Sequence, residues 1–316
     1  MKKVLGVDLA SSSWASNGTA VLEFDEQLGC IAAVVAPALR WPTDRLTPLA
    51  LADAIDAYVR ASGVRAVAFD GPQGWRDPAT PLGTPGVGRR CEYACRTQGK
   101  TGTYPRTYPA TQRAWIEFCI DLFADLLARP NVILANQVQQ AAAPAPAYMV
   151  LECYPTSAWR SSGLRPLPGK AAKPELAPYL AELSRVYGLP APAAPVTSHD
   201  DLQAIVAALC AIPLVGGPAI AEVAGSAAKM VLDAAGSLRR VEGLIWNVRP
   251  LRAAASAPAS SSRSIVPSDL SLAVPVLATG SAVRVTQRVI DQVVATELGC
   301  ATHGGCELGA EPRSQP

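Results

Sequence analysis

Short apolar runs alternate with turn-forming residues through the first part of the chain. Val4, Leu5 and Val7 lie in the first run, and the runs at 18–24 and 30–35 follow after a serine-rich turn and a polar turn that contains glycine. Runs of this length, with β-branched residues and short turns between them, are typical of strands joined by hairpins. The pattern predicts an antiparallel meander of three strands.

The apolar spacing then changes from that of a strand to that of a helix. Between residues 49 and 61 the apolar positions recur three or four residues apart, with Thr47 as the expected N-cap and Gly63 as the expected stop. The run at 64–69 follows and ends in Asp70. A helix that crosses from a meander to a further strand predicts an α/β fold whose fourth strand is parallel to the first.

The rest of the chain contains further periodic segments and two segments without periodicity. We expect helices at 111–127, 176–187 and 199–211, a strand at 147–154 and a final edge strand at 242–246. Residues 76–110 are rich in Pro, Gly, Arg and Tyr, which predicts a long functional loop or lid inserted into a domain that spans 1–250. Residues 251–316 are expected to be an Ala/Ser/Pro-rich linker and a poorly ordered tail.

Composition narrows the class of protein. Hydrophobic residues make up 49% and charged residues 17% of the chain, which is typical of a globular protein, and the net charge of +2 argues against a wholly basic nucleic-acid-binding surface. The eight cysteines form no C-x-x-C pair, and the longest apolar run, 204–215, is too short to cross a membrane. The residues after Met1 enter a predicted strand directly, so we expect no signal peptide. We therefore expect a soluble protein of the cytoplasm.

Acidic residues stand at unusual places in the apolar pattern. Asp8 and Asp70 each end an apolar strand, Glu152 is embedded in another, and Asp200 and Asp201 open a helix. A buried carboxylate is costly unless it is hydrogen-bonded, paired or bound to a cation. The carboxyl ends of parallel strands share one edge of a sheet, so these acids could converge there.

A carboxylate cluster of this kind predicts divalent-metal chemistry. The carboxylates repel one another, and a bound Mg²⁺ or Mn²⁺ would neutralise them. The predicted metal ligands are Asp8, Asp70, Glu152, Asp200 and Asp201. Two such ions can activate water and hydrolyse a phosphodiester, with the first four of these residues as the catalytic set. Each acid also has a structural explanation, since strand-end and helix-start aspartates commonly serve as turn or cap residues.

Basic residues gather in and near the predicted loop. From residue 89 to 113 there are six basic residues and one acid, with tyrosines between them. We predict that a set of these residues and one from a later segment hold substrate phosphates: Arg89, Arg90, Arg96, Lys100 and Arg160. The alternative is a solvated or ion-paired surface. A phosphate-binding function would make nucleic acid or another phosphodiester the partner.

Six short motifs in this order resemble a known family. They are GVDLA at 6–10, DGPQG at 70–74, RRCEYACR at 89–96, ECYPTSAWR at 152–160, the DD-x-x-A helix at 200–204 and EGLIW at 242–246. Together they are similar to family 429 among the domains of unknown function. The resemblance implies a ribonuclease H-like mixed sheet flanked by helices, nuclease chemistry, and catalytic acids on the first and fourth strands, which would be Asp8 and Asp70.

One position departs from that family's pattern. The family's late helix tends to carry an acid directly before an alanine, where this chain has Gln203 followed by Ala204. A glutamine cannot neutralise a cation, so Asp200, one helical turn earlier, is the expected substitute. The glutamine is also compatible with a chain that keeps the fold but has lost nuclease activity.

Two other functions fit the same sequence. Sugar kinases and related ATPases place an Asp followed by small hydroxyl residues near nucleotide phosphates, as VDLASSS at 7–13 would, although they usually duplicate the domain and this chain has one copy. The other is a non-catalytic module that binds an anion or a protein through the basic segment 89–113. Stabilisation by ATP with Mg²⁺ would favour the first, and nucleic-acid binding without metal binding would favour the second.

Overall fold

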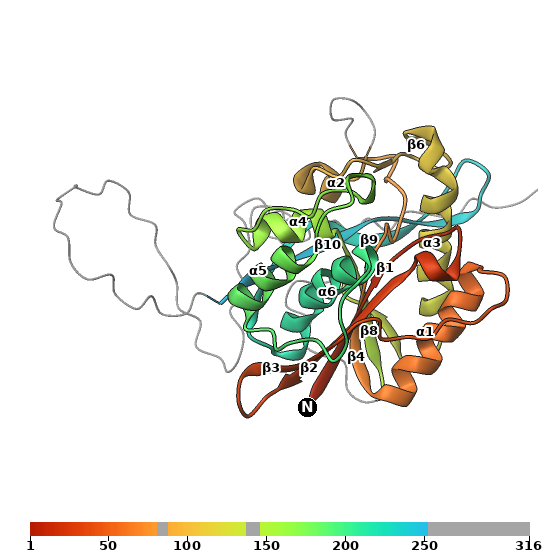
Figure 1. Ribbon diagram of the computed structural model, residues 1–316. Coiled ribbons are helices and arrows are strands. Elements are labelled where there is room, and N and C mark those ends of the chain that lie inside the picture. The colour runs from red at the N-terminus through yellow and green to blue at the C-terminus, as the bar shows by residue number, and fades with distance from the viewer. Residues whose placement is uncertain (81–87, 137–145, 252–316) are drawn as a thin grey trace, which may run out of the picture. The chain divides into compact units, whose positions relative to one another are not determined.

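The protein has a mixed β-sheet with helices on both faces (Figure 1). The structure is a computed structural model that describes residues 1–80, 88–136 and 146–251. These residues belong to one compact unit. The predicted linker and tail lie outside the described residues, apart from Leu251. None of the helices described is long and apolar enough to span a bilayer.

The first half of the sheet follows the predicted order. The meander consists of β1 (Lys2–Asp8), β2 (Gly18–Asp25) and β3 (Cys30–Val35), with β2 antiparallel to both neighbours. Helix α1 (Pro48–Ser62) then leads to β4 (Val64–Asp70), which is parallel to β1. The predicted α1 boundaries are confirmed: the side chain of Thr47 accepts a hydrogen bond from the Ala50 amide, and Gly63 ends the helix with a φ of +72°.

The second half of the sheet was only partly predicted. Strand β8 (Tyr148–Cys153) is parallel to β4, β10 (Leu238–Pro250) is parallel to β8, and β9 (Ala219–Leu232) completes the order β3-β2-β1-β4-β8-β10-β9, while β7 (Val132–Leu134) also pairs with β8. The prediction of β10 as an edge strand is wrong, because β9 pairs along it. The alanines and glycine of β9 have low strand propensity, so the pattern did not indicate that strand.

The remaining helices cover the two faces of the sheet (Figure 1). They are α2 (Arg90–Cys95), α3 (Arg113–Leu127), α4 (Pro155–Ser161), α5 (Ala177–Tyr187) and α6 (His199–Ala211). Residues 76–110 are more regular than expected of a loop, since they contain α2 and the small hairpin of β5 (Lys100–Thr101) and β6 (Thr107–Tyr108). Residues 81–87 of this insertion lie outside the described residues.

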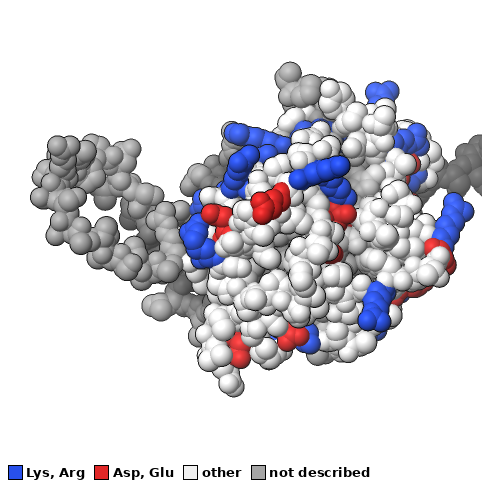
Figure 2. Space-filling model, viewed as in Figure 1, with Lys and Arg blue, Asp and Glu red and all other residues white. Residues whose placement is uncertain are grey.

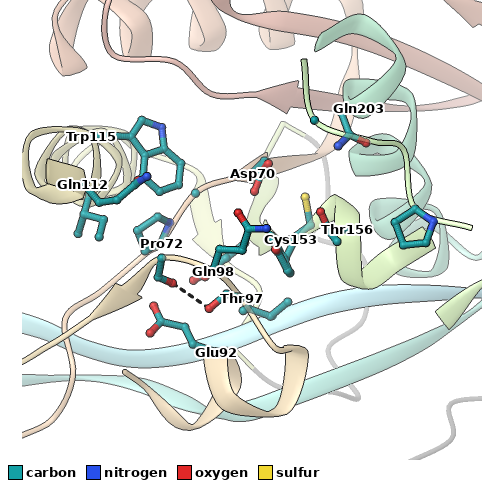
Figure 3. A pocket seen from close by; sticks show the side chains of 18 of the residues that line it. Asp70, Pro72, Glu92, Thr97, Gln98, Gln112, Trp115, Cys153, Thr156 and Gln203 are labelled. Carbon is teal, nitrogen blue, oxygen red and sulfur yellow. Dashed lines mark hydrogen bonds between the residues drawn. The ribbon is translucent and has the colours of Figure 1, made fainter. Parts of the chain in front are cut away.

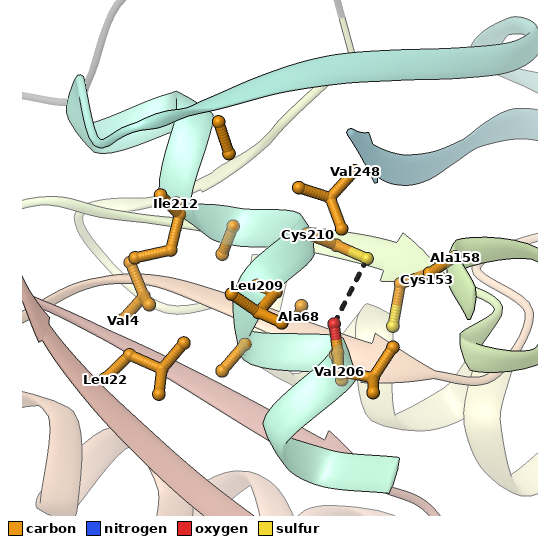
Figure 4. Close-up of a cluster of buried hydrophobic side chains, with 14 of the residues drawn as sticks. Val4, Leu22, Ala68, Cys153, Ala158, Val206, Leu209, Cys210, Ile212 and Val248 are labelled. Atoms are coloured by element: carbon orange, nitrogen blue, oxygen red, sulfur yellow. Dashed lines mark hydrogen bonds between the residues drawn. The ribbon is translucent and has the colours of Figure 1, made fainter. Parts of the chain in front are cut away.

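Side-chain alternation along the strands assigns each residue to one of two cores. Leu5 and Phe69 pack toward α1 and α3, whereas Val4 and Ala68 pack toward α6. Figure 4 shows the second core, where α6 lies among side chains of several strands. Ten successive residues of α6, from Leu202 to Ala211, are buried, so this helix is enclosed by the protein.

Candidate metal centre

Asp8 and Asp70 lie side by side at the carboxyl ends of two parallel strands. The register of β1 and β4 pairs Asp8 directly with Asp70. The four residues of each strand directly before the acid are buried, and the acid itself is partly exposed. The apolar sequence of each strand therefore brings its terminal carboxylate to the same edge of the sheet.

Two glycines let α6 bring a third carboxylate to this edge. A Cβ atom at Gly6 would lie 2.0 Å from the carbonyl oxygen of Ala204, and one at Gly18 would lie 2.1 Å from the carbonyl carbon of Asp200. Gly18 is also the β2 partner of Asp8. Only a residue without a side chain permits this approach, so Asp200 comes close to Asp8 because residues 6 and 18 are both glycine.

The three carboxylates perturb one another. Burial raises the pKa of Asp8 well above its usual value, and the charges of Asp70 and Asp200 add to the rise. Burial also raises the pKa of Asp70 to about 7, with a smaller contribution from Glu152, although a hydrogen bond with Asp8 opposes the change. Carboxyl groups so arranged bind protons or metal cations more strongly than isolated ones do.

A histidine and a lysine complete the cluster. One ligand atom each from Asp8, His199 and Asp200 lie within 4.8 Å of one another. Lys170 Nζ lies 2.6 Å from Asp200 Oδ1. Although burial by itself would raise the pKa of Asp200, hydrogen bonding and charge from His199 and Lys170 outweigh burial and lower it. Asp200 is therefore the carboxylate of the cluster that ionises most readily.

The imidazole of His199 is oriented for ligation. Its Nε2 lies 3.0 Å from the carbonyl oxygen of Pro168, which requires the proton to be on Nε2. In the neutral ring Nδ1 then carries a lone pair, and this buried atom makes no hydrogen bond of good geometry within the described chain, so the effect of His199 on the pKa of Asp200 requires a second proton, on Nδ1. Nδ1 lies 3.5 Å from Asp200 Oδ1, and a lone pair facing a carboxylate oxygen is favourable only with a cation or proton near both.

A cleft of about 500 Å³ opens beside the cluster. Figure 3 shows Asp70 between Trp115 of α3 on one side and Thr156 of α4 and Gln203 of α6 on the other. Asp70 and His199 both line this cleft. A bound molecule could therefore reach the carboxylate cluster from the cleft.

Glu152 does not fit the role of metal ligand that the sequence suggested. Arg89 donates two hydrogen bonds to it, from Nη1 to Oε2 at 2.8 Å and from Nη2 to Oε1 at 2.6 Å, and the Gln73 amide donates a third. Both oxygens are thus occupied, and the side chain is buried. Glu152 is therefore not free to bind a metal ion, and its buried pair with Arg89 forms part of the lining of the cleft.

Arg89 likewise does not fit phosphate binding. Its side chain is 1% exposed and also contacts Glu92 and Thr101. Lys100 is committed in a similar way, since its Nζ contacts the Thr97 carbonyl oxygen and lies 3.0 Å from that of Glu92. Arg89 therefore connects the insertion to β8, and Lys100 holds parts of the insertion together.

Other predicted basic residues remain at the surface. Arg90, Arg96 and Arg160 are exposed, and Arg160 Nη1 also donates to the Cys95 carbonyl oxygen at 3.3 Å. Figure 2 shows Lys and Arg side chains over the part of this face where α2, α4 and α5 lie, with acidic side chains among them. Of the predicted phosphate-binding residues, these three are available to a ligand.

The remaining polar residues at the start of α6 are structural. Asp201 accepts hydrogen bonds from the Thr19 amide at 3.1 Å and the Ser198 hydroxyl at 2.6 Å, so both of its oxygens are used and it does not fit the ligand role predicted for it. Gln203 Oε1 accepts from Trp159 Nε1 at 2.8 Å. Asp200 is therefore the residue of this turn whose carboxylate reaches the cluster.

The sequence did not indicate His199 or Lys170 as part of the site. His199 is the first residue of the helix predicted at 199–211, where a polar residue is ordinary, and Lys170 lies in the Pro-rich segment 163–195 before that helix. A histidine directly before an aspartate at the start of a helix near a sheet edge was the available signal. The position of Lys170 depends on how the segment folds, which local pattern does not encode.

The donor set suits a divalent cation. Carboxylate oxygens are preferred by Mg²⁺ and Mn²⁺, and an imidazole nitrogen favours Mn²⁺ of these two. The buried, unpaired Nδ1 of His199 fits that set. Asp8, Asp200 and His199 are the residues whose ligand atoms lie close enough together to hold one ion, and Asp70, the neighbour of Asp8, would be the fourth ligand only after a small movement toward them.

No family model matches this chain, and no curated protein or solved structure shows significant similarity to it.

Proposed function

We propose that this chain is a divalent-metal-dependent hydrolase of phosphodiester bonds, with Mn²⁺ or Mg²⁺ as cofactor and nucleic acid as the leading substrate class. The observation that carries the proposal is the grouping of Asp8, His199 and Asp200, with Asp70 beside Asp8, next to a cleft that Asp70 and His199 line. Such a group of acids is difficult to maintain unless a cation neutralises it.

The topology supports a ribonuclease H-like version of the α/β fold. Strands β3, β2, β1, β4 and β8 lie in that order, with an antiparallel meander followed by two strands parallel to β1. This is the arrangement that the sequence resemblance implies, with acids on the first and fourth strands. The additional pair β9 and β10 extends the sheet beyond β8.

The residues of the site divide into two roles. The carboxylates and His199 hold the cation, which when bound supplies an activated water and stabilises developing negative charge on oxygen. Arg90, Arg96 and Arg160 lie at the surface and would hold phosphates that flank the reacting one. The buried pair of Arg89 and Glu152 keeps the cleft floor rigid.

The proposal is tested by incubating the purified protein with end-labelled single-stranded and double-stranded DNA and RNA, with Mn²⁺ or with EDTA. We expect metal-dependent cleavage of at least one substrate, and a loss of at least ~100-fold in rate in Asp70→Asn, because several kcal/mol of transition-state stabilisation depend on the cation. Asp121→Asn, an exposed acid of α3, is the matched control and should cleave normally. Equal cleavage by wild type and Asp70→Asn would refute the proposal.

A further inference from the structure

The charge of the cluster raises the question of how many metal ions it needs. When ionised, Asp8, Asp70 and Asp200 carry three negative charges, and one divalent cation leaves one of them uncompensated. Lys170 Nζ already lies 2.6 Å from Asp200 Oδ1. One divalent cation and one ammonium group together match the three carboxylates.

Ligands for a second divalent ion are scarce. The nearby polar groups that could serve are committed to protein partners: Glu152 to Arg89, Asp201 to Thr19 and Ser198, and Gln203 to Trp159. Freeing any of them would leave a buried partner unsatisfied, which is unfavourable. The described part of the chain therefore offers one complete set of ligands.

Lys170 is held beside the cluster by its own segment. It begins the short 3-10 helix Lys170–Ala172, and Pro168, two residues earlier, accepts the hydrogen bond of His199 Nε2. Pro168 and Gly169 also line the cleft. The backbone segment that orients the imidazole of His199 thus also positions the Cα atom of Lys170 at the rim of the cleft.

We propose that Lys170 supplies the second positive charge of the site, so that hydrolysis proceeds with a single divalent cation. The lysine side chain is 56% exposed, and exposed ion pairs are weak, so the ammonium group can leave Asp200 for a phosphate oxygen in the cleft. The inference rests on the proposed function, because it assigns Lys170 a catalytic role in that reaction.

The reaction that Lys170 assists is ordinary hydrolysis. The oxygen of water forms a bond to phosphorus while the bond from phosphorus to the leaving oxygen breaks. Water loses one proton to solvent and the leaving oxygen gains one, so the products are a phosphate monoester and an alcohol. The ammonium group of Lys170 remains protonated and stabilises the negative charge that develops on the phosphate oxygens.

The inference is tested with Lys170→Met and Lys170→Arg by isothermal titration of Mn²⁺ and by cleavage assays. Lys173→Met is the matched control, because Lys173 is an exposed lysine of the same segment that makes no side-chain ion pair with a described residue. We expect wild type to bind one Mn²⁺ per chain. In Lys170→Met the Mn²⁺ affinity should rise about tenfold, since a competing cation is removed, and the cleavage rate should fall at least ~10-fold. Lys170→Arg should retain most of the rate.

The two readouts separate the possible failures. If wild type cleaves with Mn²⁺ and Lys170→Met has the same Mn²⁺ affinity and cleavage rate, the role of Lys170 is overturned but the proposed function is not. Binding of two Mn²⁺ ions by wild type would also overturn it. A wild type that binds no Mn²⁺ and cleaves nothing would overturn the proposed function and this inference with it. A purely structural role would lower the affinity and rate together with the thermal stability, and Lys170→Arg would not restore them.

Discussion

Asp8 and Asp70 are direct neighbours in the parallel pairing of β1 and β4. The two residues are separated in the sequence by two strands and a helix, yet the parallel return of the chain in β4 places their carboxylates at one edge of the sheet. Burial raises the pKa of Asp8, and the negative charge of Asp70 beside it adds to the rise. The stability of the metal-free protein, and its dependence on pH, should therefore change when either carboxylate is removed.

The first prediction concerns the stability of the metal-free protein. Asp8→Asn removes one of the repelling carboxylates and should increase the free energy of unfolding by about 1 kcal/mol, or about 2–4 °C in Tm for a domain of this size. The same change should abolish the stabilisation that Mn²⁺ gives to wild type. Thermal unfolding in EDTA and in Mn²⁺ measures both effects. A variant less stable than wild type in EDTA would contradict the proposed repulsion.

The second prediction concerns pH. The pKa of Asp70 is about 7 in the folded protein, against an ordinary value of 3.8. Between these values the unfolded chain ionises at this position while the folded protein keeps its proton, so the free energy of unfolding falls as pH rises from about 4 to 7. Metal binding needs the ionised carboxyl, so the gain in Tm from Mn²⁺ should be small at pH 5 and large at pH 8. In Asp70→Asn the free energy of unfolding should fall less steeply over this range, because Asp8, whose pKa is also raised, still contributes, and the gain in Tm from Mn²⁺ should be lost at both pH values.

The third prediction separates Glu152 from the metal ligands. Glu152→Gln leaves the buried guanidinium of Arg89 with one carboxylate partner fewer and should reduce the free energy of unfolding by about 3–5 kcal/mol in a urea titration. Below the unfolding transition the variant should still bind Mn²⁺. Normal stability combined with lost Mn²⁺ binding would show instead that Glu152 is a ligand.

The fourth prediction concerns the packing that brings Asp200 to Asp8. A Cβ at Gly6 would lie 2.3 Å from the Ala208 amide nitrogen, so Gly6→Ala must displace α6 from β1. We expect a loss of about 1–3 kcal/mol in stability, typical of overpacking, and weaker Mn²⁺ binding because the carboxylates separate. Gly29→Ala is the matched control for Mn²⁺ binding, since a Cβ there meets nothing within 4 Å and its φ of +65° predicts only local strain.

The first half of the fold could be predicted because local pattern and topology agree there. The β1–β2–β3 meander, α1 with its Thr47 cap, and the parallel β4 all follow from apolar spacing and turn residues. β9 could not be predicted, because its residues Ala219–Leu232 have little strand propensity and its pairing with β10 is a tertiary effect.

Of the site, only the residues at the ends of predicted strands could be predicted to lie together. Asp8 and Asp70 end apolar strands, so their meeting follows from the topology. The ion pair of Glu152 with Arg89 could not be foreseen, because it depends on how the insertion at 76–110 folds over the sheet. His199 and Lys170 depend in the same way on the Pro-rich segment before α6.

The most direct test of the central claim is calorimetric titration of Mn²⁺ into wild type, Asp70→Asn and Asp200→Asn near pH 8, with Asp121→Asn as the control. We predict that wild type and Asp121→Asn bind one ion per chain, while each of the other two variants folds and binds none. If Asp70→Asn and Asp200→Asn bind Mn²⁺ as tightly as wild type does, the carboxylates at this sheet edge do not form a metal centre.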